Sequence, residues 1–351
     1  MSDTRAVVGR PCPAPARSRT VREMTLVAAL KAFGHELIVG DMAVSRDDKR
    51  EDLCRKVYEI APNLVVGASG SKIAATVMIR KMVDHFKGQR ASRVELEAVL
   101  DEFSTDSLRA DLVGWLVEGE ESTSFVWKSG FYAVDTPVIS GTGDSWLRAE
   151  LEKPLAYEVL QPNNLFEAAA SILTKVGRAV AAEAIRHPSW NETWGFAYDI
   201  AIYNNGRFHW LDSIVYTTWE IHINATGEAE LTAELPGRMK TDWTEDYTVA
   251  RVMVPPLGRA NAVSPAIHAQ VDRETALKQV PFTLRSTWYV AHIRFVRDGA
   301  VTGTACMPLL NPPQDAPVHL VEFPDNSQRM HIDTRFWLDY YKRVTGSGTA
   351  G

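Results

Sequence analysis

The first apolar run of the chain reads Thr25-Leu26-Val27-Ala28-Ala29-Leu30, and the second reads Glu36-Leu37-Ile38-Val39-Gly40-Asp41. Each run has the length of a strand, and Gly34 marks a turn between them, so the pair predicts a β-hairpin. Polar and charged residues then fill 43–54 and predict a loop. The apolar stretch at 64–67 predicts a buried strand that runs into Ala68-Ser69-Gly70-Ser71.

Helices and strands follow in an order that predicts the fold class. Periodic apolar residues predict helices over 72–87, with Ile73, Val77 and Met78 on one side, over 92–103, where Ser92 and Glu95 form a capping box, and over 165–186. Further strands are predicted over 56–60, 112–117, 124–127, 136–140, 196–203 and 208–215, the last two joined by a turn at Asn205-Gly206. Two packed sheets with helices on the outside suit this order, so we expect an α+β protein.

The composition is that of a globular protein, and it excludes several functional classes. Of 351 residues, 45% are hydrophobic and 23% are charged, so the chain is neither disordered nor fibrous. No apolar run approaches the ~20 residues of a membrane span. The net charge of −6 argues against a dedicated nucleic-acid-binding protein. Three scattered cysteines (Cys12, Cys54 and Cys306) and the lack of a secretory signal favour a cytoplasmic location.

The texture of the sequence divides the chain into three parts. Residues 1–24 carry five arginines and three prolines, and we interpret them as a removable leader or a mis-started segment, with a short basic tail as the alternative. Residues 25–215 form the predicted α+β domain. Residues 216–351 are rich in strand-like segments and form a predicted β-rich C-terminal extension, for which the sequence indicates no role.

Five features of the first domain occur in a distinctive order. Thr25 follows a methionine, Asp41 ends the second strand, Lys56 opens the next one, Gly70 lies in a small-residue loop before a helix, and Thr142 lies between two glycines. In this order they resemble the N-terminal-nucleophile (Ntn) hydrolases of the proteasome β-subunit type, above all the peptidase subunit of the bacterial two-component ATP-dependent proteasome-like protease. The resemblance covers about residues 25–213 and implies a four-layer αββα sandwich.

The resemblance also implies roles for single positions. Thr25 would be the nucleophile of a threonine peptidase, Lys56 and Asp41 would tune its amine, and Gly70 would bind the oxyanion. Thr142, which stands where the family has a serine in a Gly-Ser-Gly turn, would help to orient the amine and its water.

Three further positions complete the expected site. Asp199 lies in a strand similar to the family's penultimate strand, which carries an aspartate near the site, and it would share the role of Thr142. Ser45 falls at a substrate-binding threonine of the family, and Gly67 opens the loop Gly67-Ala68-Ser69-Gly70. We expect both to bind substrate.

The sequence also departs from the family pattern. The segment between Asp41 and Lys56 is one residue shorter than usual, and the helix after Gly70 lacks the acidic residue that is common there. Both departures concern the substrate pocket and contacts within a ring, and they leave the nucleophile chemistry intact. Threonine in place of serine at Thr142 keeps the hydroxyl.

The chemistry of these residue types can be stated without the family. A threonine hydroxyl is a weak nucleophile until a base takes its proton, and the α-amine of a first residue can be that base. Such an amine has a pKa of about 7.7–8 in model chains, and a neighbouring ammonium such as that of Lys56 lowers it. Asp41 would pair with Lys56 and hold it in place. A backbone N–H at Gly70 would stabilise the tetrahedral oxyanion.

This chemistry requires that residues 1–24 be absent. Translation from Met24 with removal of the methionine, or cleavage between Met24 and Thr25, would expose the amine. If neither happens, Thr25 has an amide nitrogen and no base. The expected mature length of 351 − 24 = 327 residues is therefore a chemical condition for activity.

The resemblance implies a peptide or protein substrate and a homo-oligomeric ring, with an ATPase unfoldase as a candidate partner. It implies no cofactor and no metal, and we expect no nucleic-acid or membrane partner. Two alternatives remain open at this point. One is a non-catalytic, self-assembling scaffold or binding protein on the same fold, and the other is an amidohydrolase that acts on a small molecule.

Overall fold

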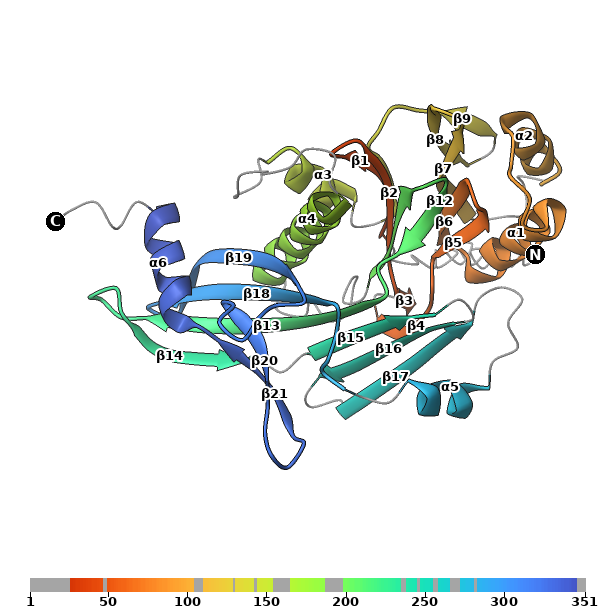
Figure 1. The fold of residues 1–351 in the computed structure, drawn as a ribbon. Helices are drawn as coiled ribbons and strands as arrows, with labels where there is room; N and C mark the ends of the chain where they lie inside the picture. The colour runs from red at the N-terminus through yellow and green to blue at the C-terminus, as the bar shows by residue number, and fades with distance from the viewer. Residues whose placement is uncertain are drawn as a thin grey trace, which may run out of the picture.

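The protein is an α+β protein in which strands predominate (Figure 1). The structure, a computed structural model, describes residues 26–46, 49–103, 110–128, 130–141, 144–153, 165–186, 198–234, 238–244, 247–254, 258–265, 272–280 and 283–345. Within these ranges the chain forms two five-stranded sheets, one seven-stranded sheet, two short two-stranded sheets and six helices.

The first five-stranded sheet contains the predicted hairpin. Its strands, in spatial order, are β10 (Val138–Gly141), β1 (Leu26–Ala32), β2 (His35–Asp41), β11 (Tyr198–Asn204) and β12 (Arg207–Trp210), and all neighbours are antiparallel. Phe33 and Gly34, and likewise Asn205 and Gly206, have positive φ angles at the two hairpin turns. Two-residue turns of this kind match the twist of the strands they join, so both turn predictions are confirmed.

The second five-stranded sheet is formed by the next part of the chain. Its strands are β5 (Val57–Ala61), β6 (Leu64–Gly70), β7 (Ala110–Glu118), β8 (Glu121–Trp127) and β9 (Phe131–Ala133), in that order and antiparallel. Two helices, α1 (Lys72–Phe86) and α2 (Arg93–Asp101), connect β6 to β7. The capping box of Ser92 and Glu95 is present at the start of α2, as predicted.

Three sequence expectations for this part were wrong. Residues 67–70, expected as a loop, are the last residues of β6 and pair with β7. Residues 43–54 form a hairpin, β3 (Ala43–Arg46) and β4 (Lys49–Leu53), where polarity predicted a loop. A two-stranded ribbon pairs its own backbone groups, so it needs no apolar pattern of its own. On α1, Ile73 and Val77 are 80% and 55% exposed. The buried stripe of α1 is Ala74, Ala75, Met78, Ile79, Met82 and Phe86.

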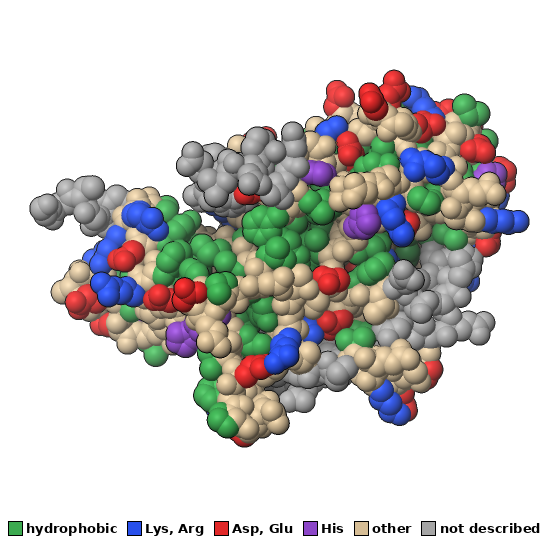
Figure 2. All heavy atoms as spheres, in the orientation of Figure 1, with side chains coloured by type: hydrophobic (Ala, Val, Ile, Leu, Met, Phe, Trp, Pro, Cys, Tyr) green, Lys and Arg blue, Asp and Glu red, His purple; other side chains and the backbone are tan. Residues whose placement is uncertain are grey.

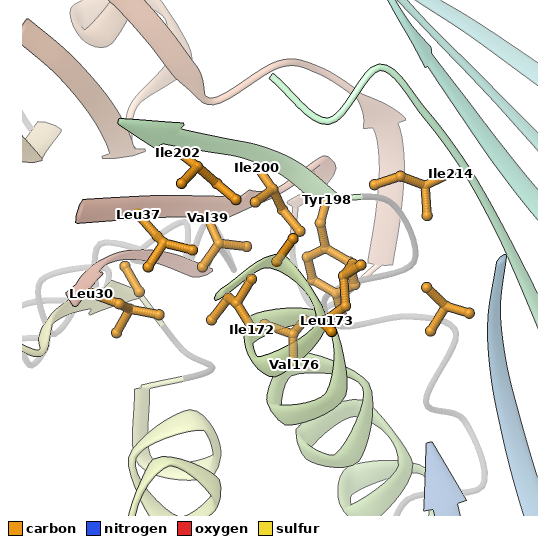
Figure 3. Close-up of a cluster of buried hydrophobic side chains, with 14 of the residues drawn as sticks. Leu30, Leu37, Val39, Ile172, Leu173, Val176, Tyr198, Ile200, Ile202 and Ile214 are labelled. Atoms are coloured by element: carbon orange, nitrogen blue, oxygen red, sulfur yellow. The ribbon is translucent and has the colours of Figure 1, made fainter. Parts of the chain in front are cut away.

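The strands of the first sheet are buried on both faces, which explains their apolar sequences. On one face, Val27 and Ile38 pack in a cluster with Val65 and Trp115 of the second sheet. On the other face, side chains of β1, β2 and β11 pack against α4 (Leu165–Arg186), with α3 (Asp144–Leu151) at the edge (Figure 3). The second sheet has a separate cluster against α1 and α2. The boundaries of α4 are those predicted from the sequence.

The C-terminal part is built mainly of strands, as expected. The seven-stranded sheet has the order β17 (Gly258–Pro265), β16 (Tyr247–Val254), β15 (Arg238–Trp243), β13 (Ser213–Ile223), β18 (Trp288–Arg297) and β19 (Ala300–Leu310), with β14 (Ala229–Glu234) also on β13. The remaining elements are α5 (Arg273–Gln279), the hairpin β20 (Val318–Glu322) and β21 (Gln328–Ile332), and α6 (Thr334–Thr345).

The extension and the first domain share one buried core. The expected boundary between residues 215 and 216 falls inside β13. Ile214 of β13 and Trp288 of β18 belong to the same buried cluster as α4 and the first sheet. In Figure 2, hydrophobic side chains cover much of the middle of the visible face, and most charged side chains lie toward its two ends.

Candidate active site

A buried ion pair lies where β1, β2 and β5 come together. Asp41, the last residue of β2, is fully buried, and its Oδ1 accepts a hydrogen bond from Lys56 Nζ at 2.6 Å. The same oxygen accepts a hydrogen bond from the backbone N–H of Leu26 at 2.9 Å. That nitrogen is covalently joined to the carbonyl carbon of Thr25. The pair predicted from the order of residues is therefore formed one peptide bond away from the predicted nucleophile.

A second buried carboxylate lies on the neighbouring strand. Asp199 of β11 stands opposite Gly40 of β2, and its Oδ2 accepts a hydrogen bond from the backbone N–H of Lys56 at 3.3 Å. Burial raises the pKa of Asp199 to about 6, the nearby Asp41 adds to this rise, and Arg55 and Lys56 oppose it. Asp41, Lys56 and Asp199 are thus gathered around one strand start, as the sequence predicted.

Gly70 ends β6 directly before α1. Its φ of +88° lies in the left-handed region, which favours glycine. Ser71 caps the helix, since its side chain accepts from the N–H of Ala74. The end of β6 lies beside the ion pair, because Ala68 N–H donates to the Lys56 carbonyl at 2.9 Å. Backbone N–H groups at a helix start lack partners within the helix, so an anion can bind to them there.

Gly67 has a packing position between the two sheets. A Cβ atom built on it would lie 2.1 Å from Val27 Cγ1, so only glycine allows β6 and β1 to approach this closely. Gly40 is similar, with 2.8 Å to Val57 Cγ2. A backbone contact between Gly67 and a substrate stays a prediction.

Two predicted site residues are not placed by the structure, and a third is placed only by its strand. Thr25 and Thr142 lie outside the described residues. Each borders a described neighbour, and these two neighbours, Leu26 and Gly141, are directly paired across β1 and β10. Ser45 lies on β3, and Cys54 N–H donates to the Met42 carbonyl at 2.8 Å and so closes the base of that hairpin. The roles of Thr25, Thr142 and Ser45 remain predictions.

Arg55 is a member of the site whose role sequence reasoning missed. It is buried, and its Nε–H donates to the Val57 carbonyl at 2.9 Å. Its guanidinium carbon lies 4.2 Å from the ring centre of Trp210 and 5.3 Å from that of Trp243. Burial lowers the pKa of Arg55, and the charge of Asp199 opposes that shift. The basic pair Arg55-Lys56 was visible in the sequence, but its aromatic partners are remote in the chain.

A hydroxyl chain was also missed. Ser69, next to Gly70, and Ser140, two residues before Thr142, have their Oγ atoms 2.8 Å apart. Ser140 Oγ donates to Asp111 Oδ2 at 3.1 Å. These bonds tie the end of β6 to β10. The end of β6 and the strand leading to Thr142 are thereby linked through their side chains.

The arrangement is chemically suited to holding a proton-transfer group. Buried charges are costly unless they are paired, and Lys56, Asp41, Arg55 and Asp199 compensate one another within a small volume. Buried ionisable residues whose pKa is shifted, as those of Asp199 and Arg55 are, are enriched at functional sites. Among the described helices, none is long and apolar enough to cross a membrane.

Neither the scan against protein-family models nor the search of curated proteins found a significant match to this chain.

Proposed function

We propose that the protein is a proteasome-like Ntn hydrolase, a threonine peptidase or amidohydrolase whose nucleophile is Thr25 once residues 1–24 are removed. On this proposal the two five-stranded sheets are the inner layers of an αββα sandwich. The strand orders β10-β1-β2-β11-β12 and β5-β6-β7-β8-β9 support it. So do the three apolar clusters, one between the sheets and one beneath each helical layer.

One observation carries the proposal. The buried Asp41 carboxylate binds both the Lys56 ammonium and the N–H of Leu26, the residue that follows Thr25. A purely structural lysine would gain more from an exposed position, because a buried ion pair rarely repays its desolvation. An ammonium fixed beside the chain start has a chemical use there, since it lowers the pKa of a neighbouring α-amine.

The proposed reaction uses the first residue as both nucleophile and base. Thr25 Oγ1 attacks the carbonyl carbon of an amide, its proton passes to the neutral α-amine, and the resulting oxyanion binds a backbone N–H at Gly70. The C–N bond then breaks, and the leaving nitrogen takes the proton from the α-ammonium. Water attacks the ester left on Thr25 and gives a proton to the same amine. The acid product leaves and the hydroxyl is restored.

The test is covalent labelling of a chain that begins at Thr25. A peptide epoxyketone bonds to a hydroxyl and an amine of one terminal residue, so it reports both groups that the proposal requires. We expect one adduct on Thr25 in this chain, located by peptide mass spectrometry. We expect none in the chain that retains residues 1–24 and none in the trimmed Thr25→Ala variant. Labelling of Thr25→Ala to the same extent, or a folded trimmed chain that stays unlabelled, contradicts the proposal.

A self-assembling scaffold is the second candidate, and one observation favours it. Ile73 and Val77 lie one turn apart on α1 and are both exposed, which is unusual for large apolar side chains on the same helix face. The intact mass of the protein from its native source separates the two candidates. A native chain that starts at Thr25 supports catalysis, and one that keeps residues 1–24 supports the scaffold.

A further inference from the structure

We propose that the C-terminal extension is part of the active site, and that Trp243 on β15 is a positioning residue that acts through Arg55 on Asp199 and Lys56. The inference rests on the proposed function and deepens it. It gives the extension a role in the reaction, although the extension lies outside the resemblance to the proteasome-type hydrolases.

The first step of the argument is the environment of Arg55. Its guanidinium is buried, and two indole rings lie within 4.2 and 5.3 Å of it. A cation over an aromatic ring is attracted by the ring electrons, and the attraction is stronger when the cation is desolvated. The flat guanidinium suits such stacking better than an ammonium would. The two rings therefore contribute, with the hydrogen bond from Arg55 Nε–H to the Val57 carbonyl, to fixing where the Arg55 charge lies.

The second step is the origin of the two rings. Trp210 belongs to β12 of the first sheet, and Trp243 belongs to β15 of the extension. The rings stack on each other with centres 5.2 Å apart and planes 15° apart. Trp243 N–H donates to the Asp212 carbonyl at 2.7 Å, which fixes its backbone to the β12–β13 connection. The stack therefore joins the extension directly to the first sheet.

The indole nitrogens of this stack indicate a constraint other than stability. Nε1 of Trp210 and Nε1 of Trp243 are buried, and neither has a hydrogen-bond partner among the described residues. A buried donor without a partner lowers stability, because its lost hydration is not replaced. A phenylalanine would avoid that cost and keep a ring face. The fold therefore keeps two large ring faces over Arg55 at some expense in stability.

The third step runs from Arg55 to the reacting residues. Of the charges that oppose the burial of Asp199, that of Arg55 has the largest effect on its pKa. Asp199 in turn accepts the backbone N–H of Lys56, and Lys56 Nζ donates to Asp41. A shift of the guanidinium thus changes the field at Asp199 and the backbone position of Lys56. The Asp41 oxygen that accepts from Lys56 Nζ also accepts the N–H of Leu26, the residue that follows the predicted nucleophile in the sequence.

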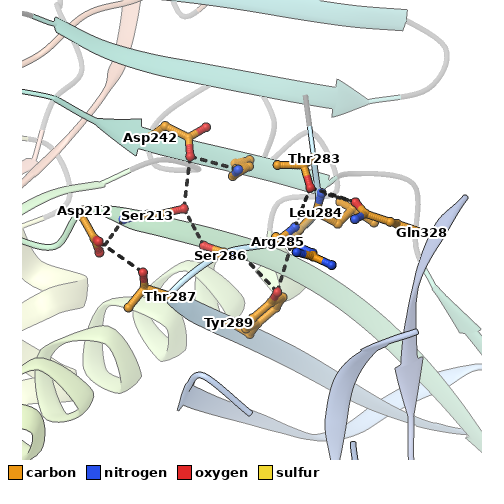
Figure 4. Close-up of polar contacts among 11 residues, drawn as sticks. Asp212, Ser213, Asp242, Thr283, Leu284, Arg285, Ser286, Thr287, Tyr289 and Gln328 are labelled. Carbon is orange, nitrogen blue, oxygen red and sulfur yellow. Dashed lines mark hydrogen bonds and ion pairs between the residues drawn. The ribbon is translucent and has the colours of Figure 1, made fainter. Parts of the chain in front are cut away.

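The extension holds β15 rigidly enough for this role. Asp242, the neighbour of Trp243, is 3.0 Å from Lys240 Nζ and accepts from Ser213 Oγ at 3.1 Å (Figure 4). Ser213 Oγ is also 2.8 Å from Ser286 Oγ. These contacts fasten β15 to β13 and to the segment that leads into β18. The position of Trp243 is therefore set by contacts with the start of β13 and with the segment that leads into β18.

The experiment measures epoxyketone labelling of the trimmed chain at increasing probe concentrations. It separates the limiting rate constant from the half-saturating probe concentration and from the labelled fraction. For Trp243→Ala we expect a limiting rate constant about 10- to 100-fold lower, because misplacement by about 1 Å has effects of this size. The half-saturating concentration should stay within threefold of wild type. Trp243→Phe, which keeps a ring over Arg55, should recover most of the rate.

The matched control is Trp219→Ala, which removes another buried indole of the extension, on β13 and in a different cluster. It should lower the melting temperature and leave the limiting rate constant within threefold of wild type. Arg55→Lys should slow labelling as much as Trp243→Ala, and the double variant should be no slower, because both changes break one interaction. If Trp243→Ala does not fold, Arg55→Lys and Trp243→Phe still decide the question.

The outcomes separate the two proposals. A folded wild-type trimmed chain that is not labelled contradicts the proposed function itself. A labelled wild type with Trp243→Ala and Arg55→Lys as fast as Trp219→Ala overturns the positioning role alone. The positioning role is also overturned if Trp243→Ala, Arg55→Lys and Trp219→Ala lower only the labelled fraction and leave the limiting rate constant unchanged. That result would show only a structural role for these residues.

Discussion

Asp199 shows how one residue of the site affects the whole fold. Its pKa is raised to about 6, chiefly by burial, and its ordinary value is 3.8. Between these two pH values the folded state binds more protons than the unfolded state, so the contribution of Asp199 to stability falls as the pH rises from about 4 to about 6. Above that range the residue is charged in both states and its cost is constant.

The prediction for Asp199→Asn follows from this sign. The amide carries no charge at any pH, so its contribution to the free energy of unfolding does not change with pH. As the pH rises from 4 to 7, the difference in the free energy of unfolding between variant and wild type should therefore change by about 3 kcal/mol in favour of the variant, as two pKa units imply. Urea unfolding at pH 4, 5, 6 and 7 measures the difference. Asp339→Asn, an exposed change on α6, controls for the loss of one negative charge. Parallel curves for Asp199→Asn and wild type would contradict the assigned cause.

At the scale of elements, the approach of β6 to β1 depends on Gly67. A Cβ there would overlap Val27 Cγ1, so we expect Gly67→Ala to lower the free energy of unfolding by about 1–3 kcal/mol, as overpacked cores do. Val27→Ala removes the overlapping atom, so the double variant should lose clearly less than the sum of the two single losses. Gly130→Ala, where the nearest atom is 3.5 Å away, should change little. Denaturant unfolding tests all four chains, and strictly additive losses would rule out the overlap.

Elements with a strong local pattern were predictable. The hairpin turns at Phe33-Gly34 and Asn205-Gly206, the capping box of α2 and the boundaries of α4 all rest on residues close together in sequence. The errors come from ambiguity in the same local patterns. The inner face of α1 was misplaced because small alanines occupy part of its buried stripe, and the charged hairpin β3–β4 has no apolar alternation to reveal it.

The candidate site was likewise predictable only where its residues belong to a local sequence pattern. Asp41 and Lys56 could be chosen because they end and begin strands in a familiar order, and Asp199 because its strand is similar to the family's penultimate strand. The structure brings the three residues together. Arg55, Trp210 and Trp243 could not be grouped in advance. Their contact depends on how β15 packs beside β12, and nothing local in the sequence encodes the relation of two strands from different sheets.

At the scale of the molecule, α4 is covered on two sides. One side packs against the first sheet, and the other meets β18 and β19 of the extension, so Cys306 of β19 contacts the Leu173 carbonyl. The face of α4 that meets the extension is therefore not free for another copy of the chain. Any assembly of this protein has to use other surfaces, and the exposed Ile73 and Val77 on α1 offer one.

The shared core predicts that the described parts of residues 25–345 unfold as one unit. Ile214 and Ile221 lie on the same strand and are both buried, but Ile214 packs in the cluster of α4 and the first sheet, and Ile221 packs in the separate cluster of β13, β18 and α6. In a single cooperative unit, Ile214→Ala and Ile221→Ala should both affect one common unfolding transition. Each should lower the free energy of unfolding by about 2–5 kcal/mol. Urea unfolding followed by tryptophan fluorescence and by circular dichroism tests this. If the extension were an independent domain, Ile221→Ala would move only the transition of the extension and leave a second one unchanged.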